Sequence, residues 1–217
     1  MNSKFVVLTI FFAVVNARLL YNPPDPDKVA AMARYIIHNT DWASVATIST
    51  LKTTVGYPFV TLKSMSDGPS DNGTGIPYLY MTDLDLSGKD ILVNNNVTIM
   101  CSLAETDYCK SKTWDPQDPR CAKVIITGKL LKVDKGTDEY AFGENALYEK
   151  HPSMRYWPKG HGFYVAKIDI LQVLVLDHFG GAEFVPLDKY FDPDIMQRLD
   201  SLDFEEIMVI AVNGVYN

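Results

Sequence analysis

The sequence predicts an α+β fold in which mostly antiparallel strands form a β-barrel with a few helices at its periphery. Two observations carry this prediction. Six or seven short segments have the alternation or the β-branched and aromatic content of strands, and a few helical segments are scattered among them. The chain shows no internal repeat and no flexible linker, so these elements are expected to form one domain.

The strand segments are found from their alternation and from the turn residues around them. Trp42 to Ser49 alternates as a strand does, and residues 122–133 form a segment long enough to bend. The adjoining segments 163–170 and 172–176 follow an irregular loop, residues 151–161, that is rich in aromatic residues, proline and glycine. The other predicted strands are residues 58–62, 77–81 and 98–103.

Helices are expected where apolar residues recur at helical spacing behind a capping residue. Asp25 is expected to cap a helix that begins at Pro26 and continues to about Asn39, because proline is favoured at the first helical position. Thr137 is expected to cap a second helix that runs to Tyr148. The other predicted helical segments are residues 84–92, with Ser87 as a cap candidate, and a stretch that begins at Val185.

The first 17 residues have the organisation of a secretory signal peptide. Lys4 gives a short basic region, residues 5–15 form an apolar run, and Val15 and Ala17 occupy the −3 and −1 positions of a cleavage site. The run holds eleven residues, whereas spanning a bilayer takes about 20, so no membrane anchor is expected. The mature chain is therefore predicted to begin at Arg18, in an oxidising and glycosylating compartment.

Composition argues against one class of partner. Without Lys4, the mature chain carries 19 basic and 27 acidic residues, a formal net charge of −8, and no block rich in Lys or Arg stands out. A nucleic-acid-binding domain normally shows a basic stripe, so no nucleic-acid partner is expected.

We expect a single domain over residues 18–191, followed by a C-terminal tail, residues 192–217, to which the sequence assigns no structure.

Two glycosylation sequons agree with secretion. Asn72 lies in a polar loop, residues 66–75, where a glycan fits easily. Asn96 lies where a predicted helix gives way to a strand. Both asparagines are predicted to carry glycans.

The three cysteines divide into an expected disulfide and a free thiol. Cys109 and Cys121 bracket a polar, proline-bearing loop, and a bridge that closes so short a loop stabilises a fold by about 3 kcal/mol. Cys101 lies in an apolar strand segment and is expected to be a free, buried thiol. A zinc site is not expected here, because no Cys or His lies between Cys109 and Cys121.

Eight short motifs, taken in order, resemble those of one family. Each motif alone is weak, but eight in this order are specific. They are residues 42–47 (WASVAT), 56–59 (GYPF), 66–69 (SDGP), 75–80 (GIPYLY), 106–110 (TDYCK), 114–119 (WDPQDP), 151–158 (HPSMRYWP) and 176–182 (LDHFGGA). The chain resembles the secreted cellular repressor glycoproteins known as CREG over roughly residues 26–191.

The resemblance implies a split β-barrel like that of the flavin-binding pyridoxamine-phosphate oxidases, built as a homodimer. It also implies a secreted, endo-lysosomal glycoprotein linked to growth restraint and differentiation and delivered by a phosphomannose-type sorting receptor. Members of the family look like enzymes that have lost the cofactor. The resemblance does not extend to residues 192–217, to Cys101 or to the two sequon positions.

The residues themselves argue against a bound flavin. Flavin mononucleotide carries a dianionic phosphate, which needs Arg or Lys side chains, a helix N-terminus or a hydroxyl cluster. Between Ala43 and Val133 the only arginine is Arg120, in the expected disulfide loop. Lys63, followed by Ser64, is the single Lys/Ser pair on a strand near a plausible phosphate position. We therefore assign no cofactor and no cofactor-binding residue.

No catalytic or metal-ligating residue is assigned either. The chain contains neither a Gly-x-Ser-x-Gly elbow nor a His-Glu-x-x-His motif. His151 and His161 flank one aromatic loop, where an acid–base or metal site is the weaker alternative to packing. Treated as consecutive strand residues, Asp177 and His178 point to opposite faces of a sheet and are expected not to pair.

The sequence thus favours a non-enzymatic, secreted or lysosomal homodimeric glycoprotein that acts through partners in growth restraint, differentiation or lysosomal function. Two alternatives stay open. One is a flavin-dependent oxidoreductase of the pyridoxamine-phosphate oxidase type, and the other is a carrier of a small hydrophobic or haem-like ligand in the barrel groove.

Overall fold

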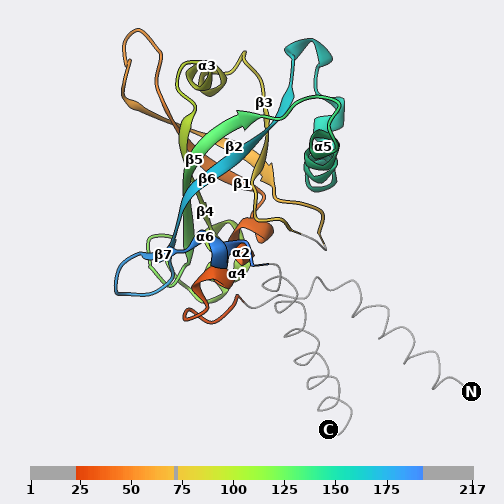
Figure 1. The fold of residues 1–217 in the computed structure, drawn as a ribbon. Helices are drawn as coiled ribbons and strands as arrows, with labels where there is room; N and C mark the ends of the chain where they lie inside the picture. The colour runs from red at the N-terminus through yellow and green to blue at the C-terminus, as the bar shows by residue number, and fades with distance from the viewer. Residues whose placement is uncertain (1–22, 71–72, 193–217) are drawn as a thin grey trace, which may run out of the picture.

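A computed structural model describes residues 23–70 and 73–192. Its strands are β1 Trp42–Ile48, β2 Pro58–Ser66, β3 Tyr78–Met81, β4 Asn96–Ser102, β5 Lys123–Lys132, β6 Tyr164–Leu176 and β7 Glu183–Val185. They form one antiparallel sheet in the order β3-β2-β1-β4-β5-β6-β7, and β3 also pairs with the first part of β6. This additional pairing closes six strands into a barrel (Figure 1), so the predicted α+β split barrel is confirmed.

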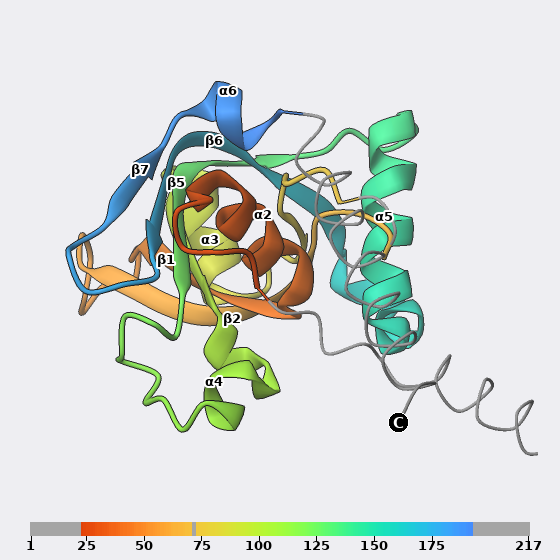
Figure 2. The ribbon, with the colours of Figure 1, turned by 90° about the horizontal axis from the view of Figure 1, so that it is seen from below.

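Helices close the two ends of the barrel. The helices are α2 Val29–Asn39, α3 Leu86–Val93, α4 Asp107–Ser111, α5 Asp138–Lys150 and α6 Leu187–Tyr190, with 3₁₀ turns η1 Leu103–Glu105, η2 Pro152–Tyr156 and η3 Lys159–His161. Figure 2 shows α2 within the ring of strands at one end and α5 outside the ring, while α3 lies at the opposite end (Figure 1). Residues 32–37 of α2 are all buried, which is typical of a helix inserted into a core.

The barrel interior is filled by side chains. Val45, Ile99, Ile126 and Val173 pair in register across β1, β4, β5 and β6, and all four are fully buried. Residues that are paired across antiparallel strands lie on the same face of the sheet, so these four form one layer of the core. Small barrels are typically packed in this way.

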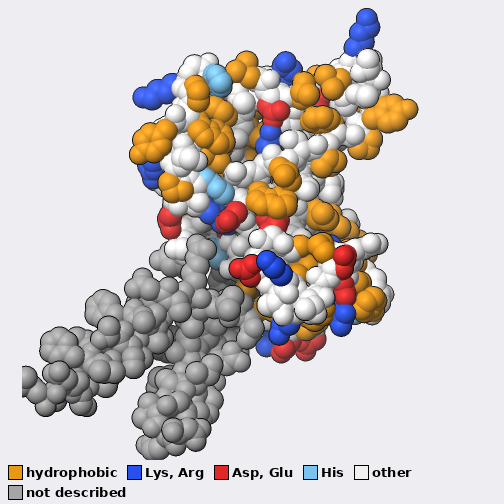
Figure 3. Space-filling view, turned by 180° about the vertical axis from the view of Figure 1, so that it is seen from behind, with side chains coloured by type: hydrophobic (Ala, Val, Ile, Leu, Met, Phe, Trp, Pro, Cys, Tyr) orange, Lys and Arg blue, Asp and Glu red, His pale blue; other side chains and the backbone are white. Residues whose placement is uncertain are grey.

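One outer face of the barrel is apolar, and we call it the apolar face. Leu62 and Met100 both pair with Ser44, and Val60 pairs with Ala46, so their side chains lie on one side of β2, β1 and β4. Val60 and Leu62 are each 60% exposed. Figure 3 views the molecule from behind and shows hydrophobic side chains over the upper and middle parts of this side.

The structure corrects the predicted start of the first helix. The Lys28 amide donates to the carbonyl oxygen of Asp25, which makes residues 25–28 a separate turn, and α2 begins only at Val29. Asp25 is therefore not the cap. In α3, Asp85 holds the N-cap position and Ser87 lies inside the helix.

The two strand segments predicted after the aromatic loop form one continuous strand, β6. Thr127 pairs with Gln172 and Gly128 with Ile170, so Leu171 is an extra residue opposite β5. Such a bulge bends the strand that carries the extra residue and explains why the alternation of β6 breaks at this point. The three-residue strand β7 was not predicted from the sequence. The predicted cap of α5 is confirmed, because the side chain of Thr137 accepts a hydrogen bond from the Tyr140 amide.

No helix in residues 23–70 and 73–192 is long and apolar enough to cross a membrane. The predicted signal peptide, the predicted glycan acceptor Asn72 and the tail beyond Asp192 lie outside the described residues.

Candidate functional site

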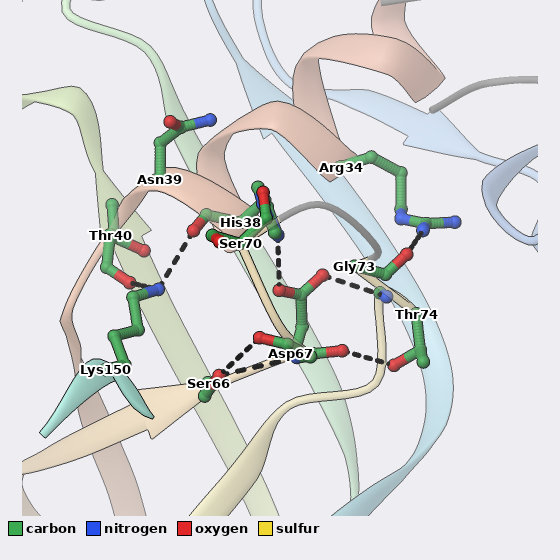
Figure 4. Close-up of polar contacts among 12 residues, drawn as sticks. Arg34, His38, Asn39, Thr40, Ser66, Asp67, Ser70, Gly73, Thr74 and Lys150 are labelled. Carbon is green, nitrogen blue, oxygen red and sulfur yellow. Dashed lines mark hydrogen bonds and ion pairs between the residues drawn. The ribbon is translucent and has the colours of Figure 1, made fainter. Parts of the chain in front are cut away.

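A buried polar network fixes the loop that leads to and from the first sequon (Figure 4). Asp67 directly follows β2 and is fully buried. Its carboxylate accepts hydrogen bonds from Nδ1 of His38 at 2.8 Å and from the amide of Gly75 at 3.0 Å. Its main-chain oxygen accepts bonds from the Thr74 amide at 2.8 Å and hydroxyl at 2.6 Å. We call Arg34, His38, Asp67, Thr74 and Gly75 the loop clamp.

Arg34 holds the other side of the loop. Its side chain comes from α2, is almost fully buried, and donates to the carbonyl oxygens of Gly73 and of Tyr190 in α6, the latter at 3.0 Å. Gly75 has φ +78°, and a Cβ there would lie 2.6 Å from Nε of Arg34, so glycine is required. The Tyr190 hydroxyl donates to the Gly75 oxygen at 2.6 Å. Arg34 and Tyr190 thus join the loop to both α2 and α6.

Lys150 attaches α5 to the same region. Its ammonium donates to the carbonyl oxygens of His38, at 2.9 Å, and of Thr40, at the C-terminal end of α2. The C-terminus of a helix carries partial negative charge, so a cation is favoured there. Burial lowers the pKa of Lys150. The next residue, His151, places Nε2 3.0 Å from the Met65 carbonyl oxygen of β2.

The surroundings of His38 favour its imidazolium form. Its Nδ1 faces Asp67, and its Nε2 lies 3.1 Å from the carbonyl oxygen of Ser70. A neutral imidazole donates from only one nitrogen, so two acceptors favour the doubly protonated ring. Burial alone lowers the pKa of His38, but Asp67 and the Ser70 carbonyl outweigh burial and the charge of Lys150, and the pKa is raised above 6.5. With both ring nitrogens hydrogen-bonded, the His38–Asp67 pair holds the loop in position.

At the α3 end of the barrel, two acidic side chains, Asp85 and Asp90, bind residues of β2 and β1. The ammonium of Lys63, the sequence's candidate for a phosphate, is ion-paired with Asp85 beside α3. Asp90 of α3 is buried and accepts bonds from the Thr47 hydroxyl at 2.8 Å and from the Thr50 amide at 2.7 Å. Although burial alone raises it, these hydrogen bonds hold the pKa of Asp90 below its usual range.

Comparison with known proteins identifies the family. The model of the CREG β-barrel family matches residues 24–192. The chain belongs to the CREG family. It is 42% identical to Protein CREG1 of Gallus gallus over 171 residues, which covers 78% of this chain and 88% of that protein. It is 36% identical to Protein CREG2 of Homo sapiens over 169 residues, covering 78% of this chain and 58% of that protein.

Solved structures share the fold of this CREG chain at low identity. A heme binding protein from Mycobacterium smegmatis superposes with a TM-score of 0.61 and 18% identity, over 79% of this chain and 62% of that one. A Clostridium acetobutylicum protein of the pyridoxinephosphate oxidase family gives a TM-score of 0.51 and 12% identity, over 76% and 99%. Likeness at these identities establishes the split-barrel fold and says nothing of the ligand.

The structure places the remaining predicted residues of the CREG chain in separate locations. Cys109 and Cys121 form a disulfide and Cys101 is free and buried, as the sequence predicts. Asn96 is exposed at the first position of β4. His161 stacks on Phe163, with ring centroids 6.1 Å apart.

His151 and His161 do not form a metal site with a third ligand among the residues that the structure describes. His151 instead contacts β2 beside the loop clamp. The loop between them packs through an aromatic ring: its Trp157 lies 5.1 Å from the ring of Phe163, which follows the loop and stacks on Tyr80 of β3 with centroids 5.0 Å apart.

The expectation that Asp177 and His178 do not pair is wrong. Oδ1 of Asp177 lies 2.7 Å from Nδ1 of His178. Because β6 ends at Leu176, the alternation of a strand no longer applies to these two residues.

The folded CREG chain is expected to gain stability as the pH falls from about 7.5 to about 5. The raised pKa of His38 means that its contribution is complete below pH 6.5 and is lost as the pH rises through the folded-state pKa. Burial raises the pKa of Glu105 to about 7, so its charged form opposes folding over the same window. Thermal unfolding midpoints should rise towards acid pH, less steeply in His38→Gln and Glu105→Gln. A midpoint of the unmodified protein that is constant over this range would contradict the expectation.

Proposed function

We propose that this CREG-family chain is a secreted or endo-lysosomal glycoprotein without enzymatic activity, which acts as a homodimer through partners in growth restraint, differentiation or lysosomal function. One observation carries the non-enzymatic part. Lys63, the one strand cation that the sequence offers to a flavin phosphate, is already neutralised by Asp85. A phosphate at this position would have to displace a carboxylate from its partner.

The arginines support the same conclusion. Guanidinium groups are the usual ligands of a flavin phosphate. Among the described residues, Arg34 is occupied in the loop clamp, Arg120 pairs with Asp118 at 2.6 Å, and Arg155 lies over the ring of Tyr148 at 4.8 Å. None of these three guanidinium groups belongs to a strand of the barrel.

Two further features support a glycoprotein that acts through binding. The loop clamp holds Ser70 and Gly73, the described residues on either side of positions 71 and 72, through His38 and Arg34. The exposed side chain of Asn96 offers a second acceptor. We propose that glycans at Asn72 and Asn96 are the groups that a phosphomannose-type sorting receptor recognises, and that the apolar face packs against a second copy of the chain.

Protein purified from the medium of a secretory cell should begin at Arg18 and should be colourless. Added flavin mononucleotide should keep its fluorescence at micromolar protein, and Lys63→Ala should not change that result, because Lys63 has no phosphate to bind. The measurements are N-terminal sequencing, an absorption spectrum and a fluorescence titration.

Three results would contradict this proposal in different ways. An absorption band near about 450 nm, or saturable quenching with a dissociation constant of about 1 μM that Lys63→Ala weakens, would favour the flavin-dependent oxidoreductase. A band near about 400 nm would favour the haem carrier. An intact Met1 on the purified protein would refute export through a cleaved signal peptide.

A further inference from the structure

We propose that Asp177, His178 and Glu183 form a binding site for a divalent transition metal, with Zn²⁺ as the ion that fits best. This site lies outside the loop clamp and goes beyond the proposed function. It also runs against the expectation from sequence that the chain has no metal ligands. Asp177 and His178 directly follow β6, and Glu183 begins β7, so the three residues lie on the two sides of one short hairpin.

The first observation is the gathering of ligand atoms. One carboxylate oxygen from each acidic residue and one ring nitrogen of His178 all lie within 4.8 Å of one another. Among residues 23–70 and 73–192, this is the one such group with three or more His, Cys, Asp or Glu side chains. Metal ligands lie about 2.0–2.2 Å from Zn²⁺, so small side-chain rotations would bring three donors around one ion.

The second observation is an unsatisfied buried oxygen. The Asp177 side chain is 1% exposed, and its Oδ2 atom has no hydrogen-bond partner among the residues that the structure describes. A buried carboxylate oxygen without a partner is costly, because it has lost water without gaining a protein donor. A cation beside this carboxylate would remove that cost.

An imidazolium held between two carboxylates is the competing explanation. Nδ1 of His178 lies 2.7 Å from Asp177, but Nε2 lies 3.5 Å from Oε1 of Glu183. The second distance exceeds that of an ordinary hydrogen bond, and this arrangement leaves Oδ2 of Asp177 unsatisfied. A metal ion accounts for the long second distance, because it needs neither a proton nor direct contact between the ligand atoms, and its charge would compensate the buried carboxylate of Asp177.

The donor set selects the class of metal. Ca²⁺ and Mg²⁺ take oxygen ligands, whereas one imidazole with two carboxylates suits Zn²⁺ and its transition-metal neighbours. The side chains of His178 and Glu183 are 41% and 45% exposed, which gives an ion access from solvent. Gly180 keeps the ring edge open, because a Cβ there would lie 3.1 Å from Nε2 of His178.

Isothermal titration calorimetry of the full chain with Zn²⁺ alone, after treatment with a chelator, tests this site. We expect one Zn²⁺ per chain, and at least about tenfold weaker binding in His178→Gln and in Glu183→Gln, which are partly exposed and should fold. Asp177→Asn should weaken binding as well. His161→Gln is the matched control and should bind as the unmodified protein does. Ca²⁺ and Mg²⁺ should give no saturable heat.

Two outcomes would overturn the site. The first is no saturable Zn²⁺ binding up to about 1 mM, a dissociation constant worth only about −4 kcal/mol. The second is unchanged Zn²⁺ binding in both His178→Gln and Glu183→Gln. Either result would leave an imidazolium ion pair as the explanation of the cluster.

Discussion

Replacement of Asp67 by alanine is expected to lower the free energy of unfolding by about 3 kcal/mol. The carboxylate of Asp67 is the acceptor for both the His38 imidazolium and the Gly75 amide. Alanine would leave a buried cation and a buried amide without partners, and the lost partner of a buried charge usually costs 3–5 kcal/mol. The side chain of His38 is 15% exposed, so the expected loss of stability lies near the lower end of this range.

Chemical denaturation measures this loss, and Asp25→Ala is the matched control. The side chain of Asp25 is 77% exposed, so its removal should change the unfolding free energy by no more than about 0.5 kcal/mol. Hydrogen exchange adds a local readout, because the Gly75 amide loses its carboxylate acceptor and should exchange faster in Asp67→Ala. If Asp67→Ala is as stable as Asp25→Ala, the loop clamp does not stabilise the fold.

A double-mutant cycle separates the pair from the rest of the network. In the Asp67→Ala background, His38→Gln should cost little, because the imidazolium has already lost its partner. Additive losses would show that the two side chains act independently.

The sequence predicted those elements whose signal is local. β1 alternates along its whole length, and Thr137 caps α5 through its own side chain, so each could be recognised within a few residues. The Cys109–Cys121 bridge closes a short loop and was equally accessible. The barrel closure itself depended on the family resemblance, because the pairing of β3 with β6 joins residues that are far apart in the chain.

The loop clamp could not be predicted, because its bonds join distant residues. His38 and Asp67 are separated by 29 positions, and Arg34 and Tyr190 by 156. Asp67 lies within one of the family motifs, but a motif does not show which donor its carboxylate accepts from. Lys63 is a similar case, since its neutralisation by Asp85 depends on how α3 docks on the barrel.

The substitution Leu62→Glu is expected to convert the proposed dimer into a monomer. Leu62 lies at the middle of the apolar face and is 60% exposed in the single chain, so a polar residue there should not disturb the fold. In a twofold dimer the same patch is used by both copies, so one substitution places two charges in the interface. At about 2 kcal/mol for each buried charge, the dissociation constant should rise by about 10³-fold.

Sedimentation velocity at micromolar concentration measures the change, and Tyr156→Glu is the matched control. Tyr156 is 85% exposed and lies in η2, so it is not part of the strands that form the apolar face. The unmodified chain and Tyr156→Glu should therefore sediment as dimers, and Leu62→Glu as a folded monomer. An unmodified chain that is monomeric at this concentration would refute the homodimer. If Leu62→Glu is still a dimer, the apolar face is not the interface, because a buried, unpaired glutamate at the centre of the contact would have separated the two copies.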